Sequence, residues 1–180
     1  MPVVPSSHTF VDGVATSSEQ NTYVRDPIAF LLRPPTAELR QIVAQTLTTA
    51  VGGAITFTTE DLDSDPDGTG GHDNLTNPSR YTARYPGWYM VSGAVCFVAN
   101  ATGMRHAYLR VNGADVLGSV GSCTPSAADV VAANCRPRKV FLNQADYVEL
   151  VGYQSSGGNL NTFVTTTPYQ SGMSVHWVSN

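Results

Sequence analysis

The chain has 180 residues, of which 42% are hydrophobic and only 13% are charged, and its formal net charge is −4. This length and hydrophobic share predict one domain with its own core plus a short additional segment, and the negative charge argues against nucleic acid as a partner. The chain contains no apolar run of about 18 residues, so the sequence predicts no membrane insertion.

The N-terminal arm, residues 1–36, differs from the rest of the chain because prolines stand near both of its ends. Within it, Ser17 and Gln20 have the spacing of a capping box, which predicts the start of a helix. Asp26 followed by Pro27 predicts a second start, with Asp26 as the N-cap. We therefore expect one or two short helices, whose apolar side chains are too few to form their own core and must pack on the main domain, on sister chains or on a larger particle. These side chains are Tyr23, Val24, Ile28, Phe30, Leu31 and Leu32.

From about residue 39, apolar residues recur with a period of two, which predicts β-strands. Residues 87–99 are apolar on both faces, so we expect this strand to be buried on both sides. Residues 104–111 alternate between apolar and polar and lead into Asn112-Gly113, a strong hairpin signal. Eight to ten short strands at this spacing predict an all-β sandwich or barrel. The expected strands cover 39–47, 53–62, 87–99, 104–111, 115–121, 128–135, 138–143, 147–154, 160–166 and 172–178.

Short motifs follow one another along this β-rich part of the chain. They are RYT at 80–82 with PGWY at 86–89, LRVNG at 109–113, LNQADYVEL at 142–150 and SGMSV at 171–175. In this order they resemble the complement-globular-head and tumour-necrosis-factor-like jelly rolls, except that Ala145 stands where that family has glycine. The resemblance implies a ten-stranded antiparallel jelly-roll sandwich over residues 37–180 that assembles as a homotrimer.

The arm carries a second set of motifs, with DG at 12–13, NTYVRD at 21–26 and FL at 30–31. Together they resemble a short segment that opens many structural proteins of tailed bacteriophages. The resemblance implies a component of the virion whose arm binds other phage virion proteins, such as the major capsid or a tail protein. The attachment residues would be Tyr23, Val24, Arg25, Asp26, Ile28, Phe30 and Leu31.

No catalytic set emerges from the sequence, so we do not expect an enzyme. The four histidines lie outside nucleophile-elbow and zinc-binding spacings, and His106 and His176 are expected on strand surfaces or at an interface. The three cysteines are an odd number, which is poor evidence for a disulfide framework. Cys96 is expected as a buried thiol, while a bond between Cys123 and Cys135 stays open as the less favoured alternative.

An acidic loop, residues 61–68, holds Asp63, Asp65 and Asp67 at alternate positions before Gly68. This spacing resembles the first half of a calcium loop, in which carboxylate oxygens converge on the cation. The twelfth position is Asn74 instead of glutamate, so the bidentate ligand is missing. A solvated loop is the favoured interpretation, and calcium is the alternative.

Aromatic residues recur on the predicted strands, and two interpretations are open. Large apolar side chains dominate cores and interfaces between subunits, which is the favoured interpretation. Stacking on sugars is the alternative, with host-surface glycans as partners. The residues assigned to the core or trimer interface are Trp88, Tyr89, Phe97, Tyr147 and Trp177, and Tyr153 shares the same pattern.

Three functions compete. A trimeric knob that decorates the capsid, or a short head fibre, is favoured because an arm of this length gives little reach. A minor tail or tail-tip protein that binds the host is the alternative, and a soluble cellular ligand-binding trimer is less favoured. Residues 2–7 lack the features of a signal peptide. We therefore expect a protein made in the host bacterial cytoplasm and located on the virion surface.

Overall fold

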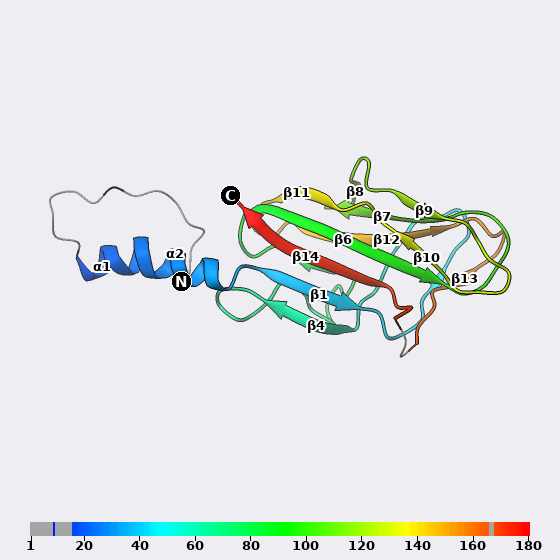
Figure 1. Cartoon of the computed structure of the whole chain (residues 1–180), viewed down its shortest axis with the longest axis horizontal. Helices are drawn as coiled ribbons and strands as arrows, with labels where there is room; N and C mark the ends of the chain where they lie inside the picture. Colours follow the sequence, from blue (N-terminus) through cyan, green and yellow to red (C-terminus); the bar gives the residue numbers. More distant parts are fainter. Residues whose placement is uncertain (1–8, 10–15, 166–167) are drawn as a thin grey trace.

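The computed structural model describes residues 9, 16–165 and 168–180. Two antiparallel sheets pack against each other, and a helical arm projects from one end of the sandwich, next to the C-terminus (Figure 1). The first sheet runs in the order β4 (Thr59–Ser64), β1 (Thr36–Arg40), β14 (Gly172–Ser179) and β6 (Gly87–Phe97), with β10 (Val131–Asn134) and β11 (Arg138–Leu142) both pairing with β6.

The second sheet is centred on β7 (Arg105–Val111) and β12 (Tyr147–Gln154), which pair over seven residues of each strand. The strands β8 (Ala114–Asp115) and β9 (Gly121–Cys123) pair with the other edge of β7, and β3 (Gly53–Ala54) and β5 (Arg80–Thr82) pair with β12. A separate short pair joins β2 (Thr46–Leu47) to β13 (Leu160–Asn161). The predicted all-β, two-sheet jelly roll with a short helical arm is confirmed.

Several predicted strands are divided in the structure. The strand expected over 39–47 ends at Arg40 and resumes as β2, and the strand expected over 53–62 is split into β3 and β4. The chain changes sheets between these segments, and the side chain of Gln45 takes over part of the backbone pairing. Its amide accepts a hydrogen bond from the Thr56 N–H at 3.0 Å and donates to the Ala54 carbonyl at 2.8 Å. Alternation along the sequence does not reveal such a side-chain bridge.

The central strand β6 corrects the expectation of burial on both faces. Tyr89 and Val91 are fully buried between the sheets, whereas Trp88 and Met90, which alternate with them, are 38% and 40% exposed. The inner face of β6 therefore belongs to the core, and its outer face is apolar but open in a single chain. The alternation predicted for 104–111 is confirmed, because Ala107 and Leu109 are fully buried.

Turns follow the sequence signals closely. Asn112 and Gly113 both have positive φ, 49° and 80°, and connect β7 to β8 as the Asn-Gly pair predicts. Ala145, which stands where the resembled family has glycine, adopts φ 72° and donates its N–H to the Ala83 carbonyl at 2.8 Å. The turn before β12 thus keeps a left-handed residue without the glycine that would favour it.

The arm forms a helix from Ser17 to Leu32, made of α1 (Ser17–Gln20), a π-helical turn (Asn21–Arg25) and α2 (Asp26–Leu32). The capping box is formed by Thr16 and Glu19, one residue before the predicted pair Ser17 and Gln20. Asp26 lies inside the helix and is no N-cap, because the π-helical turn carries the helix through this position without a break.

Candidate functional site

The arm is held on the jelly roll by one of its predicted attachment residues. Phe30 is fully buried and packs edge-on against Tyr85, with ring centroids 5.3 Å apart, and against Trp177, at 4.8 Å. The indole N–H of Trp177 donates to the Pro86 carbonyl, which fixes the ring that receives Phe30. Phe30 therefore packs on the chain's own domain, which is one of the expected docking surfaces, and contact of the arm with a virion protein stays a prediction.

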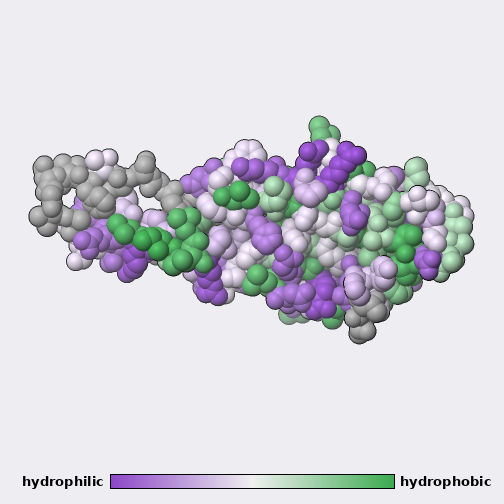
Figure 2. Space-filling view, viewed as in Figure 1, coloured by the Kyte–Doolittle hydropathy of each residue, from purple (hydrophilic) through white to green (hydrophobic). Residues whose placement is uncertain are grey.

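The other apolar attachment residues face solvent. Val24, Ile28 and Leu31 are 43%, 51% and 59% exposed, and Tyr23 is exposed to a similar degree. Figure 2 shows hydrophobic side chains gathered along this part of the chain, beside the sandwich. Arg25 and Asp26 form an ion pair with each other at 2.8 Å, so the predicted charged residues neutralise one another on the arm.

The acidic loop is built around its own backbone and one arginine. Both oxygens of Asp63 accept backbone N–H groups of residues 71–72, and Asp65 accepts the N–H of Asp67. Arg84 contacts Asp65 at 2.9 Å and Asp67 at 2.7 Å. Burial raises the pKa of Asp63 and Asp65, and the hydrogen bond from Asp65 holds that of Asp67 below its usual range.

These contacts favour the interpretation as a loop without metal, and calcium binding by Asp63, Asp65 and Asp67 stays a prediction. Calcium requires six to eight oxygen ligands that converge on one point. Here the carboxylates point into their own loop and are occupied by N–H donors and a guanidinium group. Across residues 16–165 and 168–180, no three His, Cys, Asp or Glu side chains come together as metal ligands. Within the described residues, the loop is held together by these internal contacts.

The predicted interface aromatics divide between core and surface. Tyr89 and Phe97 are fully buried in the core, and the Tyr89 hydroxyl donates to the Tyr85 carbonyl. Tyr147 is half-buried under the guanidinium of Arg80, which lies 3.9 Å from the ring centroid. Trp177 holds the arm, so among the five predicted aromatics Trp88 is the one left open on the sheet surface.

Trp88 belongs to an outer face of the first sheet that carries further apolar side chains. Its ring packs edge-on against Phe141, with centroids 5.5 Å apart, and the Lys139 ammonium lies 5.3 Å from it. Phe141 and Met90 are 44% and 40% exposed, and Val178 on β14 is 47% exposed. We call Trp88, Met90, Phe141 and Val178 the outer apolar face.

The second sheet carries a pocket of about 400 Å³ on its own outer face, lined by residues that sequence reasoning did not bring together. Two of its aromatic residues, Tyr108 and Tyr153, stand 45 positions apart in the chain, and the register of β7 with β12 places them on adjacent strands. The alternation of His106 and Tyr108 along one strand could be read from the sequence, whereas the partner strand and its register could not.

The histidines and cysteines considered in the sequence make isolated contacts in the described structure. His176 contacts Thr36 and Glu38 on the exposed strand surface, and His106 contacts Ser122. All three cysteines are free, and Cys96 is buried, as expected. No helix within the described ranges is long and apolar enough to cross a membrane. The absence of enzymatic activity stays a prediction.

Comparison with known proteins shows the fold alone. The globular domain of a zebrafish complement 1qA protein aligns with 81% of this chain and 98% of its own, at 13% identity and a TM-score of 0.54. Eiger TNF from S. frugiperda aligns over 81% and 93% at 11% identity and a TM-score of 0.55. Murine APRIL aligns over 80% and 98% at 10% identity and a TM-score of 0.57. No protein-family model and no curated protein sequence matches the chain.

Proposed function

We propose that three copies of this chain form a knob on the surface of a bacteriophage particle, anchored by their N-terminal arms, as a capsid decoration or short head fibre. The observation that carries the proposal is a helix docked at one point on a self-sufficient domain, with its remaining apolar side chains turned to solvent. The resemblance of residues 12–31 to a segment of phage structural proteins is the reason for proposing a phage particle as the structure that the arm binds.

The outer apolar face supports the threefold assembly. Its aromatic and aliphatic side chains are open in one chain, and burying such a surface between copies is favourable. A closed ring is built from contacts between two different surfaces of each copy, so this face would pack against another part of the neighbouring chain.

Sedimentation tests the trimer. Trp88→Asp places a charge on the outer apolar face, and we expect it to convert a trimer at micromolar concentration into monomers. Tyr169→Asp is the matched control, because Tyr169 is 55% exposed and lies outside that face. Far-ultraviolet circular dichroism of both variants checks that the sandwich is folded. A monomeric unmodified protein, or a trimer that survives Trp88→Asp, contradicts the assembly.

The arm has the properties of an anchor. Ile28, Leu31 and Leu32 are 51%, 59% and 80% exposed, and burying each fully would contribute about 1.5–3 kcal/mol before ordering costs. Three arms on one trimer act together, so weak individual contacts give firm attachment. The helix from Ser17 to Leu32 is about 24 Å long, which holds a knob close to the particle instead of extending it as a long fibre.

The attachment experiment keeps Phe30 in place and changes only exposed side chains. Phage carrying Ile28→Asp with Leu31→Asp should lose the protein from purified particles, although the purified variant remains folded and trimeric. Leu75→Asp is the control, since Leu75 is 90% exposed in a loop outside the arm. Normal copy number in the double variant rejects the arm as the anchor. Imaging labelled protein on intact particles distinguishes the head from the tail, and a tail-tip location replaces decoration by the host-binding alternative.

A further inference from the structure

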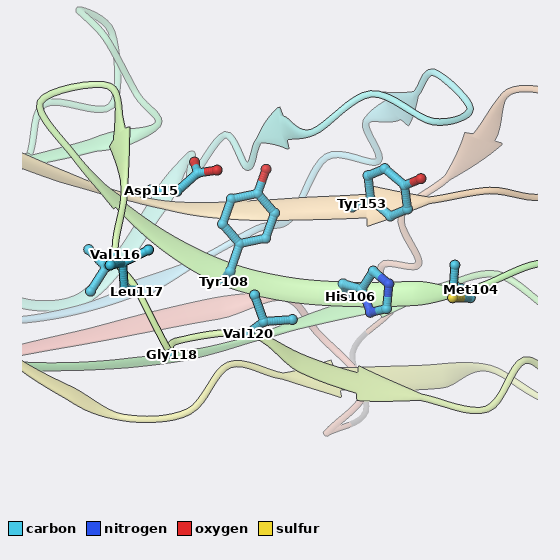
Figure 3. Close-up of a pocket in the computed structure, with 9 residues that line it drawn as sticks. All are labelled: Met104, His106, Tyr108, Asp115, Val116, Leu117, Gly118, Val120 and Tyr153. Atoms are coloured by element: carbon cyan, nitrogen blue, oxygen red, sulfur yellow. The ribbon is translucent and has the colours of Figure 1, made fainter.

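The pocket on the second sheet has a continuous wall of side chains from β7. His106 and Tyr108 alternate along this strand, Met104 immediately precedes it, and Tyr153 from β12 stands beside them (Figure 3). The remaining lining comes from Asp115 on β8 and from the segment that leads to β9, with Val116, Leu117, Gly118 and Val120.

One part of the pocket is aromatic and held in place. His106 and Tyr153 are directly paired across the strands, and their rings stack with centroids 5.3 Å apart and an interplanar angle of 22°. The Ser122 hydroxyl lies 2.7 Å from Nδ1 of His106 and fixes that ring from the other side. The stack and the Ser122 contact hold the Tyr153 and His106 rings in place before any ligand arrives, which reduces the cost of binding.

The other part is polar but electrically balanced. Asp115 pairs with Arg110 at 3.0 Å, and the same guanidinium donates a hydrogen bond to the Tyr108 hydroxyl at 3.2 Å. Burial raises the pKa of Tyr108, so its hydroxyl stays protonated at neutral pH. The pocket therefore presents a carboxylate and tyrosine hydroxyls as hydrogen-bonding groups without an unbalanced charge that would select an ion.

We propose that this pocket binds a neutral saccharide, with the apolar face of one pyranose ring against Tyr153 and its hydroxyl groups on Asp115 and Tyr108. Such a ring is apolar on its faces and carries hydrogen-bonding groups around its edge, which matches flat aromatic and aliphatic walls beside a polar group. A volume of about 400 Å³ lies at the lower end of small-molecule sites and suits one or two sugar rings.

The same contacts disfavour an organic cation, the other ligand class that aromatic residues attract. Arg110 already lies 5.7 Å from the centroid of the Tyr108 ring and already neutralises Asp115, so a second cation would compete with it. The inference goes beyond the proposed knob and does not depend on it, because purified protein can bind a sugar whether or not the arm anchors it to a particle.

Saturation-transfer and chemical-shift NMR test the proposal on the full chain. The probes are methyl β-D-galactopyranoside, methyl α-D-glucopyranoside and N-acetyl-D-glucosamine, with choline as the cationic probe. For a ligand of this size we expect saturable binding of at least one sugar with a Kd of about 1 mM. The shifts should be confined to the pocket. Tyr153→Ala should weaken that binding about three- to tenfold, whereas Tyr169→Ala, an exposed tyrosine elsewhere, should not change it.

Three results overturn the proposal. The first is the absence of saturable binding for all three sugars by the folded protein. The second is equal affinity in Tyr153→Ala and the unmodified chain, which would place the sugar elsewhere. The third is choline binding in the pocket in preference to every sugar, which would assign it to a cation. Tyr153→Phe keeps the ring and serves as the conservative variant, so it should retain most of the affinity if stacking is the main contact.

Discussion

Phe30 connects the arm to the sandwich, and its removal should release the arm while leaving the sandwich folded. Among the described arm residues from Thr16 to Leu32, Phe30 is the one that is fully buried. Phe30→Ala removes both of its ring contacts, and truncating a buried phenylalanine costs about 3–5 kcal/mol. The jelly roll keeps its own core, so we expect most of this loss to appear as local undocking of α2.

Hydrogen exchange measures that undocking directly. A loss of about 3 kcal/mol corresponds to roughly a hundredfold decrease in the protection of amides that exchange through undocking. The peptide covering residues 26–33 should therefore exchange faster in Phe30→Ala, with little change in peptides from β6 and β12. Leu32→Ala is the matched control on the same helix, because Leu32 is 80% exposed. If residues 26–33 keep their protection in Phe30→Ala, the docking argument is wrong.

Three further predictions concern the loops. Asp146 accepts hydrogen bonds from the Asn143 N–H and the Asn112 side chain, both at 2.7 Å, and these hold its pKa below the usual range. The contribution of Asp146 to the free energy of unfolding is therefore present above the unfolded pKa of about 4 and is lost as the pH falls through the lowered folded pKa. Asp146→Asn should cost about 1 kcal/mol at neutral pH, and its Tm should converge with that of the unmodified protein at low pH. A difference in Tm between the two proteins that stays constant with pH would contradict this prediction. Chelator or added calcium should leave the Tm unchanged, because the acidic loop is already satisfied by N–H donors and Arg84; a calcium-dependent shift would restore the metal hypothesis. Ala145→Gly should raise the free energy of unfolding by up to about 1 kcal/mol, since it relieves a left-handed alanine, and a lower denaturation midpoint would show that the methyl group packs favourably.

The sequence predicts this fold well where the signals are local. Alternation over 104–111 and the Asn112-Gly113 turn need no distant partner, and both are found as expected. The arm's helix was also predictable from capping residues, although Thr16 takes the place of Ser17. Where a strand crosses between sheets, as around Gln45, a side chain replaces the backbone partner, and the pattern of apolar residues gives no sign of it.

The candidate sites were less predictable because they depend on contacts between distant segments. Aspartates at alternate positions left calcium open as the less favoured alternative, and no local signal showed that Arg84, seventeen residues after Asp67, pairs with this loop. The sequence predicted Phe30 as an attachment residue, because no local signal shows that Trp177, far along the chain, packs against it. Likewise, Tyr108 and Tyr153 become neighbours only through the register of two strands.

The pairing of β1 with β14 determines when this protein can fold. Thr36 lies opposite His176, 140 positions later in the chain. β14 also lies between β1 and β6 in the middle of its sheet, and closing so long a loop slows folding. Phe30 packs against Trp177 on β14, so the arm can dock only once this long-range pairing has formed. The first strand of the sandwich and the arm therefore become ordered together with β14.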